Sequence, residues 1–208
     1  MRLIKFCIVL LGFSTAAVAD EIAKLELIER LESYQTITAN FEQRTYNDDS
    51  TSVDVATGDF QIAKPMKFTW IVNRPYEQKV ISDGTTLWVY DPDLDQATHQ
   101  QISDDIEQSP AMILSQPRRV LADQYDVQLA KNDQLTIYRL TPRNPETVFD
   151  DLTLIFNQEN AIDEIRIKDS LGQETVVQFS NVQYDQKIDD SAFIFTPPPG
   201  TDVFEQAQ

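Results

Sequence analysis

The segment from Gly58 to Gln96 constrains the fold of this chain more than any other part of the sequence. Its apolar residues recur at every second position, which is the period of a β-strand with one buried face. Breaks at Lys64-Pro65, Asn73-Arg74-Pro75 and Asp83-Gly84 divide it into short runs. The first two contain Pro, which cannot donate to a sheet ladder, and the third is a typical turn pair. The pattern predicts an antiparallel β-meander. Asp-Gly further predicts a two-residue type I′ turn, since both central residues of that turn need positive φ.

Aromatic and flexible apolar side chains are concentrated in this meander. One strand alternates apolar and polar residues from Met66 to Asn73, whereas the run from Leu87 to Tyr90 is apolar on both faces. We therefore expect an apolar surface that needs more cover than a single thin layer provides. The residues predicted to form it are Phe60, Met66, Phe68, Trp70, Leu87, Trp88 and Tyr90.

The N-terminus has the pattern of a secretory signal peptide. Arg2 and Lys5 precede a short apolar run that leads to Ala17-Val18-Ala19, which is an A-x-A cleavage site. The alternative is a membrane anchor, but the run is shorter than the ~20 residues that span a bilayer. We expect cleavage of residues 1–19, export to the periplasm, and one domain over residues 20–208. Cys7 is the only cysteine, so the exported part has no disulfide and no cysteine for lipidation.

Two helices are expected to lie against the sheet. In the first, Asp20 is the predicted N-cap, and an apolar stripe runs through Ile22, Leu25, Ile28 and Leu31 with Leu27 beside it. The second is a short apolar helix that begins at Ser109-Pro110, contains Met112, Ile113 and Leu114, and is stopped by Pro117. A helix this short needs a surface to lie on, either as part of an ordinary core or as a movable lid.

Further alternating runs predict strands across the rest of the chain. They include Ile37–Phe41, Gln96–Gln100, several runs between Tyr125 and Phe179, and Phe193–Phe195. The expected fold is mainly β: a strongly curved, incompletely closed antiparallel barrel of about 11 strands, with short helices over an apolar cavity.

Charge and motifs argue against several functions. The net charge of −17 repels phosphate backbones, so nucleic-acid binding is not expected. The only histidine is His99, and no G-x-S-x-G nucleophile elbow is present. Asp91, Asp93 and Asp95 have the spacing that opens a calcium loop, but Gln96 stands where that loop needs Gly. We interpret this segment as a turn and expect no metal, no cofactor and no enzymatic activity.

The order and spacing of several short motifs resemble the LolA-type periplasmic carriers of outer-membrane lipoproteins. The matching pieces are Gly58-Asp59-Phe60, Lys64-Pro65, Phe68-Thr69-Trp70, Pro75, Ser82-Asp83-Gly84, Leu87-Trp88-Val89-Tyr90, Asp91-Pro92, Gln96, Ser109-Pro110-Ala111, Leu114, Asp169-Ser170-Leu171-Gly172-Gln173 and Phe193-Ile194-Phe195-Thr196-Pro197-Pro198-Pro199-Gly200. Together they span nearly the whole chain after the signal.

The resemblance implies a monomeric chaperone that binds the acyl chains of lipoproteins. It implies cargo release by an inner-membrane ABC-type complex, delivery to a LolB-like acceptor at the outer membrane, and a lid formed by the two helices. Lys64 stands where relatives usually carry an Arg that latches the lid. It is either a weaker latch or a solvated Lys at a strand end. The alternative functions are a LolB-like acceptor, a lipid-sensing regulatory domain of the same fold, or a secreted hydrolase.

Overall fold

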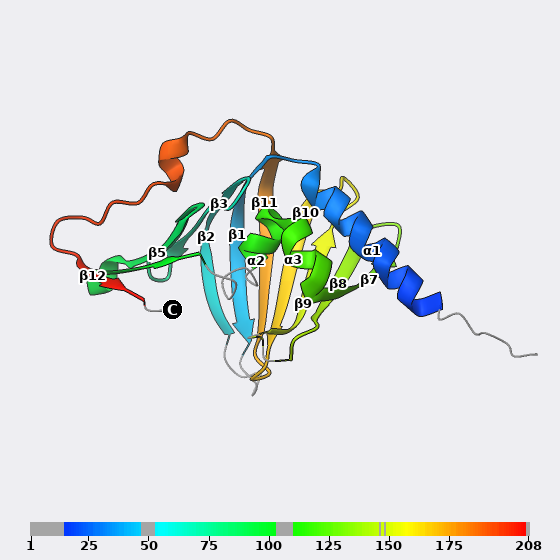
Figure 1. Cartoon of the computed structure of the whole chain (residues 1–208). Helices are drawn as coiled ribbons and strands as arrows, with labels where there is room; N and C mark the ends of the chain where they lie inside the picture. The colour runs from blue at the N-terminus through cyan, green and yellow to red at the C-terminus, as the bar shows by residue number, and fades with distance from the viewer. Residues whose placement is uncertain (1–14, 47–52, 103–109, 146, 148, 207–208) are drawn as a thin grey trace, which may run out of the picture.

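A computed structural model describes residues 15–46, 53–102, 110–145, 147 and 149–206 (Figure 1). The helices are α1 (Thr15–Glu32), α2 (Pro110–Ser115) and α3 (Pro117–Gln124), with 3-10 turns η1 (Pro92–Leu94) and η3 (Asp190–Phe193). The strands are β1 (Thr36–Tyr46), β2 (Val53–Ala63), β3 (Lys67–Arg74), β4 (Gln78–Asp83), β5 (Thr86–Asp91), β6 (Gln96–Gln101), β7 (Tyr125–Lys131), β8 (Thr136–Pro142), β9 (Phe149–Phe156), β10 (Ile162–Asp169), β11 (Glu174–Tyr184) and β12 (Asp202–Glu205). Within these ranges no helix is both long and apolar enough to cross a membrane.

The described strands form one curved sheet of twelve, in the order β12-β6-β5-β4-β3-β2-β1-β11-β10-β9-β8-β7. The expected meander is present as β2 to β6, and its neighbours pair antiparallel throughout. The sheet is not closed, because β12 and β7 are its two edges. The curved, mainly antiparallel, incompletely closed fold is therefore confirmed, with one strand more than expected. One pairing differs, since β12 runs parallel to β6.

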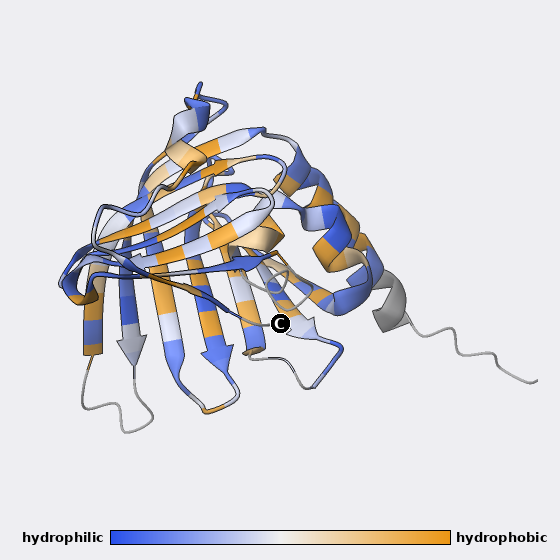
Figure 2. Ribbon diagram, turned by 60° about the vertical axis from the view of Figure 1, so that its left-hand side comes forward, coloured by the Kyte–Doolittle hydropathy of each residue, from blue (hydrophilic) through white to orange (hydrophobic). Residues whose placement is uncertain are grey.

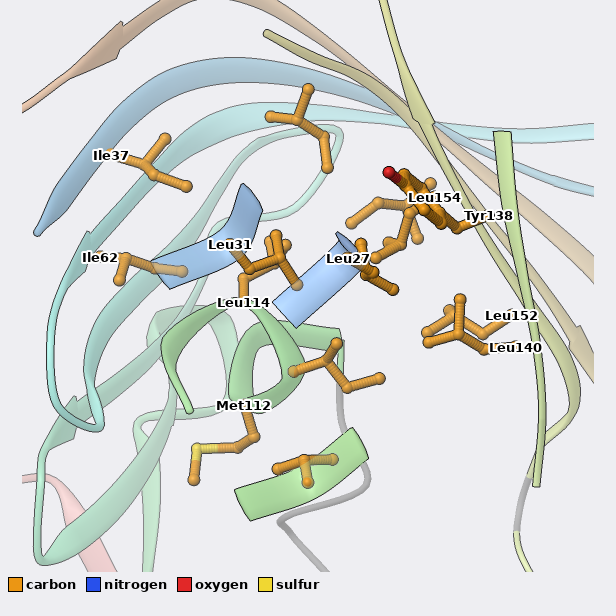
Figure 3. Close-up of a cluster of buried hydrophobic side chains, with 14 of the residues drawn as sticks. Leu27, Leu31, Ile37, Ile62, Met112, Leu114, Tyr138, Leu140, Leu152 and Leu154 are labelled. Atoms are coloured by element: carbon orange, nitrogen blue, oxygen red, sulfur yellow. The ribbon is translucent and has the colours of Figure 1, made fainter. Parts of the chain in front are cut away.

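The main core lies between the concave face of the sheet and the three helices (Figure 2). Alternate strand residues point inward, as the pleat requires. Figure 3 shows Leu27 and Leu31 of α1 and Met112 and Leu114 of α2 among side chains from the strands. All four are at most 1% exposed. The helices thus cover one face of the sheet.

The apolar stripe of α1 is displaced from the one predicted. Ile22 and Leu25 are 60% and 48% exposed, whereas Ala23, Leu27 and Ile28 are buried. A strict spacing of three residues drifts around a helix that has 3.6 residues per turn, so the first two predicted positions leave the buried face. Leu25 is therefore exposed rather than part of the buried core. Asp20 is also not the N-cap, because α1 begins at Thr15 and spans the expected cleavage position.

The turn at Asp83-Gly84 differs from the prediction, and the chain after α2 contains a helix that was not predicted. At Asp83-Gly84 only Gly84 has positive φ, at 98°. The Asp83 carboxylate accepts from the backbone N–H groups of Thr85 and Thr86, both at 2.8 Å. This side-chain acceptor builds a wider loop than the type I′ turn that was expected. Pro117 ends α2, as predicted, but it is also the first residue of α3, a helix that the sequence analysis missed. The predicted N-cap Ser109 lies outside the described residues.

The C-terminal segment forms an arm over the convex face of β3 to β5. The strand predicted at Phe193 to Phe195 is absent. Phe193 ends the turn η3, whose N-cap Asp189 accepts from the Ser191 N–H at 2.9 Å. The three prolines that follow have no N–H to donate to a ladder. The chain then reaches the sheet edge as β12 (Figure 1).

Candidate binding cavity

A cavity of about 260 Å³ lies between the concave face of the sheet and α2. Nine of its ten lining residues are apolar. They are Phe68, Trp70, Val80, Leu87, Pro110, Ala111, Ile165, Ile167 and Val177, and the tenth is Gln43. β3, β4 and β5 supply one wall and β1, β10 and β11 another, with α2 as the cover. Such a site can hold an apolar group by burial and contact, without directional bonds.

Three of the seven residues predicted for the apolar surface line this cavity: Phe68, Trp70 and Leu87. Phe60 is 1% exposed in the core beside it. Its ring lies 5.4 Å from that of Trp70, centroid to centroid. Met66 packs against the same core, half-buried. These five side chains are therefore gathered on the concave face.

Trp88 and Tyr90 lie on the other face. In β5 they alternate with Leu87, so the pleat points them outward. Both rings pack against Phe195 of the C-terminal arm, at centroid distances of 5.4 and 5.2 Å. This explains why the run from Leu87 to Tyr90 is apolar on both faces. One face lines the cavity, and the other packs against the arm. Trp88 and Tyr90 are thus outside the cavity with which the sequence analysis grouped them.

The sequence analysis missed the wall contributed by the second half of the chain. Ile165 and Ile167 come from β10, and Val177 comes from β11. β11 pairs with β1, more than a hundred residues away in sequence, and β10 pairs with β11. The alternation of these residues showed that they face one side of a sheet. Only the strand order shows that this side is the one shared with Phe68.

Lys64 bonds to the end of a helix, at the turn between β2 and β3. Its Nζ donates to the carbonyls of Leu31 and Tyr34, the latter at 2.7 Å, and lies 3.6 Å from the centre of the Tyr34 ring. These carbonyls belong to the last turn of α1 and the residues just after it. Burial lowers the pKa of Lys64 to about 8, although the carboxylates of Glu32 and Asp185 oppose this shift.

Further bonds tie the three helices together. The Tyr34 hydroxyl donates to the Leu114 carbonyl of α2 at 3.3 Å, and burial raises the pKa of this tyrosine. Arg118 of α3 donates through Nε and Nη2 to the Glu32 carboxylate, with the Nε bond at 2.9 Å. That bond lowers the pKa of Glu32. Lys64 is thus connected to α2 through Tyr34, and to α3 through α1.

Two other residues examined in the sequence have local structural contacts. Asp91 caps η1, where its carboxylate accepts from the N–H groups of Asp93 and Leu94, so this segment forms a turn. The His99 ring lies 4.7 Å from that of Trp88 on the convex face. Among the described residues, no three His, Cys, Asp or Glu side chains are grouped so as to hold a metal ion.

Comparisons with known proteins agree with this geometry. The family described as "Outer membrane lipoprotein carrier protein LolA" matches residues 32–196. The chain is 36% identical over 197 residues to an outer-membrane lipoprotein carrier protein of Alcanivorax borkumensis, covering 94% of this chain and 93% of the relative. It is 33% identical over 207 residues to a protein of the same name from Pseudomonas fluorescens, covering 99% and 100%.

A solved structure supports the fold independently. An uncharacterized conserved protein from Thermus thermophilus matches with a TM-score of 0.58 at 11% identity, covering 88% of this chain and 98% of that one. The open curved sheet, the helices on its concave face and the apolar cavity between them define a class of binding proteins. Within that class, the chain belongs to the LolA family of outer-membrane lipoprotein carriers.

Proposed function

We propose that this protein is a periplasmic chaperone that binds the acyl chains of lipoproteins in the cavity under α2. The observation that carries the proposal is a cavity with nine apolar lining residues, partly covered by a helix of six residues, in a chain of the LolA family. The role is binding rather than catalysis, because such a lining offers contact area and no reacting group.

The energy of burial explains why a carrier is needed. Each buried CH₂ group of an acyl chain contributes about 0.8 kcal/mol, so a chain of about 16 carbons gains about 12 kcal/mol from an apolar environment. That free energy is lost if the chain is exposed while crossing an aqueous compartment. A protein cavity can replace the bilayer during transfer, and its flexible apolar surface still allows release.

The cavity must widen to accept such cargo. At about 260 Å³ it is below the roughly 300–1,000 Å³ typical of sites for small ligands. The α2 side chains Met112, Ile113 and Leu114 belong to the core cluster, each at most 1% exposed. We infer that α1 and α2 act as the lid and move away from the sheet when acyl chains enter.

We further propose the compartment and the partners. Residues 1–19 act as a signal that is cleaved on export, which leaves residues 20–208 in the periplasm. The carrier then receives lipoproteins from an inner-membrane ABC-type complex and transfers them to a LolB-like acceptor. N-terminal sequencing of protein recovered from the periplasm tests the first step. A mature chain that begins at Asp20 supports it, and recovery in the membrane fraction with residues 1–19 attached contradicts it.

A charge in the cavity tests the binding site. In Phe68→Glu a carboxylate replaces a ring that is 3% exposed in the cavity wall, and burying an unpaired charge is costly. Ala111→Glu places the same charge on the half-buried cover helix, where folding is less affected. We expect both variants to lose most of their affinity for an apolar fluorescent dye and for a triacylated lipopeptide that displaces it.

Gln178→Glu is the matched control. Gln178 is exposed and lies one residue from the cavity-lining Val177, on the opposite face of β11. This variant should bind dye and lipopeptide as the wild type does. Unchanged affinity in folded Ala111→Glu and Phe68→Glu proteins would show that acyl chains do not enter here.

A further inference from the structure

Gln43 is the one polar side chain among the ten that line the cavity. It is half-buried, and its inward direction follows from its pairing with Val177 of β11. Its Nε2 lies 3.5 Å from Thr45 Oγ1, which is the outer limit of a hydrogen bond. The described residues provide it with no second partner. A side-chain amide has two donors and an acceptor with two lone pairs, so most of the capacity of Gln43 remains available to a ligand.

The position of Gln43 marks a change of polarity along β1. The inward-facing residues Ile37, Ala39 and Phe41 are at most 7% exposed, whereas Gln43 and Thr45 are half-buried. The Thr45 hydroxyl lies 3.4 Å from that of Thr175 on β11. Along β1, the inward face of the sheet is therefore apolar under the helices and polar toward Thr45 and its partner Thr175 at the start of β11. This gradient matches an amphiphile whose hydrocarbon lies under the helices and whose polar end points away from them.

We propose that Gln43 binds the ester carbonyl at the root of the cargo's acyl chains, and so sets their depth and direction in the cavity. This inference rests on the proposed function. An ester oxygen taken into an apolar cavity loses its bonds to water, and that loss costs free energy unless a donor replaces it. Gln43 supplies the donor at the border between the apolar and polar parts of this inward face. The ligand class is an ester-linked acyl chain, as distinct from a plain hydrocarbon or an ether lipid.

Two lipopeptide probes that differ only in this carbonyl test the proposal. One carries two palmitoyl ester chains on a thioglyceryl-cysteinyl peptide, and the other carries two hexadecyl ether chains on the same peptide. The wild type should bind the ester probe about three- to tenfold more tightly, which is the range for one hydrogen bond. Gln43→Met keeps the length of the side chain but removes its hydrogen bonds, and should bind the two probes equally. Gln178→Met makes the same substitution on the convex face of β11 and should keep the wild-type preference.

The outcomes separate this proposal from the carrier function. An ester preference that persists in Gln43→Met overturns the role of Gln43 and leaves the carrier function standing. Equal weakening of both probes in Gln43→Met points to packing instead and also overturns it, as does a wild type that binds both probes equally well. A wild type that binds neither probe refutes the carrier function and this inference with it. The hydrocarbon dye diphenylhexatriene reports whether the cavity of Gln43→Met is intact, and its affinity should be unchanged.

Discussion

Gly58 is the position at which a single side chain would most disturb the sheet. A Cβ built there would lie 1.9 Å from the Ile71 carbonyl oxygen and 2.6 Å from the ring of Phe41. That ring instead stacks on Trp70 at a centroid distance of 3.9 Å. The missing Cβ therefore lets an aromatic side chain cross β2 and reach the wall of the cavity.

We expect Gly58→Ala to lower the free energy of unfolding by about 3 kcal/mol or more, because backbone on one side and a packed ring on the other must move. Urea denaturation measures this change. Thr57→Ala, at the adjacent position, should cost at most about 1 kcal/mol, within the range of strand propensity. Equal midpoints for Gly58→Ala and the wild type would show that β2 and β3 can separate at no cost.

Lys64 should make stability depend on pH above neutrality. Its pKa is about 8 in the folded protein, below its ordinary value of 10.5, because it is partly buried. Between these two values the unfolded chain binds more protons than the folded one, so the free energy of unfolding rises with pH. Below pH 8 both states are protonated, and the cost of burying the charge is present in full. The stability of the wild type relative to Lys64→Met should thus increase from about pH 7 to about pH 9.5.

Thermal unfolding of the two proteins across this range measures the effect. Lys187→Met replaces an exposed lysine and serves as the control, with a difference from the wild type that stays constant. A constant difference for Lys64→Met as well would contradict the assignment of this lowered pKa to the folded state.

At the scale of elements, the C-terminal end of α1 is where the parts of the lid meet. Lys64 donates to backbone carbonyls there. The Tyr34 hydroxyl donates to a carbonyl of α2, and the Glu32 carboxylate accepts from Arg118 of α3. The ion pair is exposed, with Arg118 64% and Glu32 38% accessible, so it contributes at most about 1 kcal/mol. The half-buried Lys64 is the stronger candidate for the latch.

We predict that amide hydrogen exchange in the last turn of α1 and in α2 responds to position 64. Arg carries five donors in a planar fork, whereas Lys carries a compact ammonium, so Lys64→Arg should slow exchange there. Lys64→Met removes a charged donor worth about 1.5–3 kcal/mol and should speed exchange several-fold. Exchange in β10 should be equal in all three proteins. The same rates in α1 and α2 for all three would leave Lys64 with no latching role.

At the scale of the whole molecule, the sheet has an apolar layer on each face. The concave layer contacts the helices and includes the cavity. The convex layer lies under the arm and contains Ile81, Tyr90, Ala97 and Phe193, each at most 8% exposed. Lys67 adds an ion pair to Asp190 at 2.8 Å. Because the sheet separates the two layers, a substitution in one layer does not remove contacts from the other.

Phe193→Ala tests this separation. Removing a ring that is 1% exposed should lower the free energy of unfolding by about 3 kcal/mol, measured by urea denaturation. Lipopeptide affinity of the folded variant should stay within about twofold of the wild type, because the ring does not reach the cavity. A large loss of affinity at preserved fold would show that the arm is coupled to the cavity through the sheet.

Much of the local structure could be predicted from alternation and turn residues. The meander, the breaks at Lys64-Pro65 and Arg74-Pro75, and the burial of Met112 to Leu114 depend on the sequence nearby. The errors have local causes too. A spacing of three residues was followed where the helix has 3.6 residues per turn, so Leu25 was placed on the wrong face. The Asp83 side chain also formed bonds that the type I′ prediction did not include.

What the sequence determined by itself is which residues share a face of each element, because that depends only on the period of the strand or helix. Only the tertiary structure decided which faces meet. Phe68 and Ile165 line the same cavity because β1 pairs with both β2 and β11. Trp88 lies outside the cavity, on the opposite face of β5, where the arm returns across the sheet and its Phe195 packs against the Trp88 ring. These contacts join residues that are distant in the chain, and no local pattern encodes them.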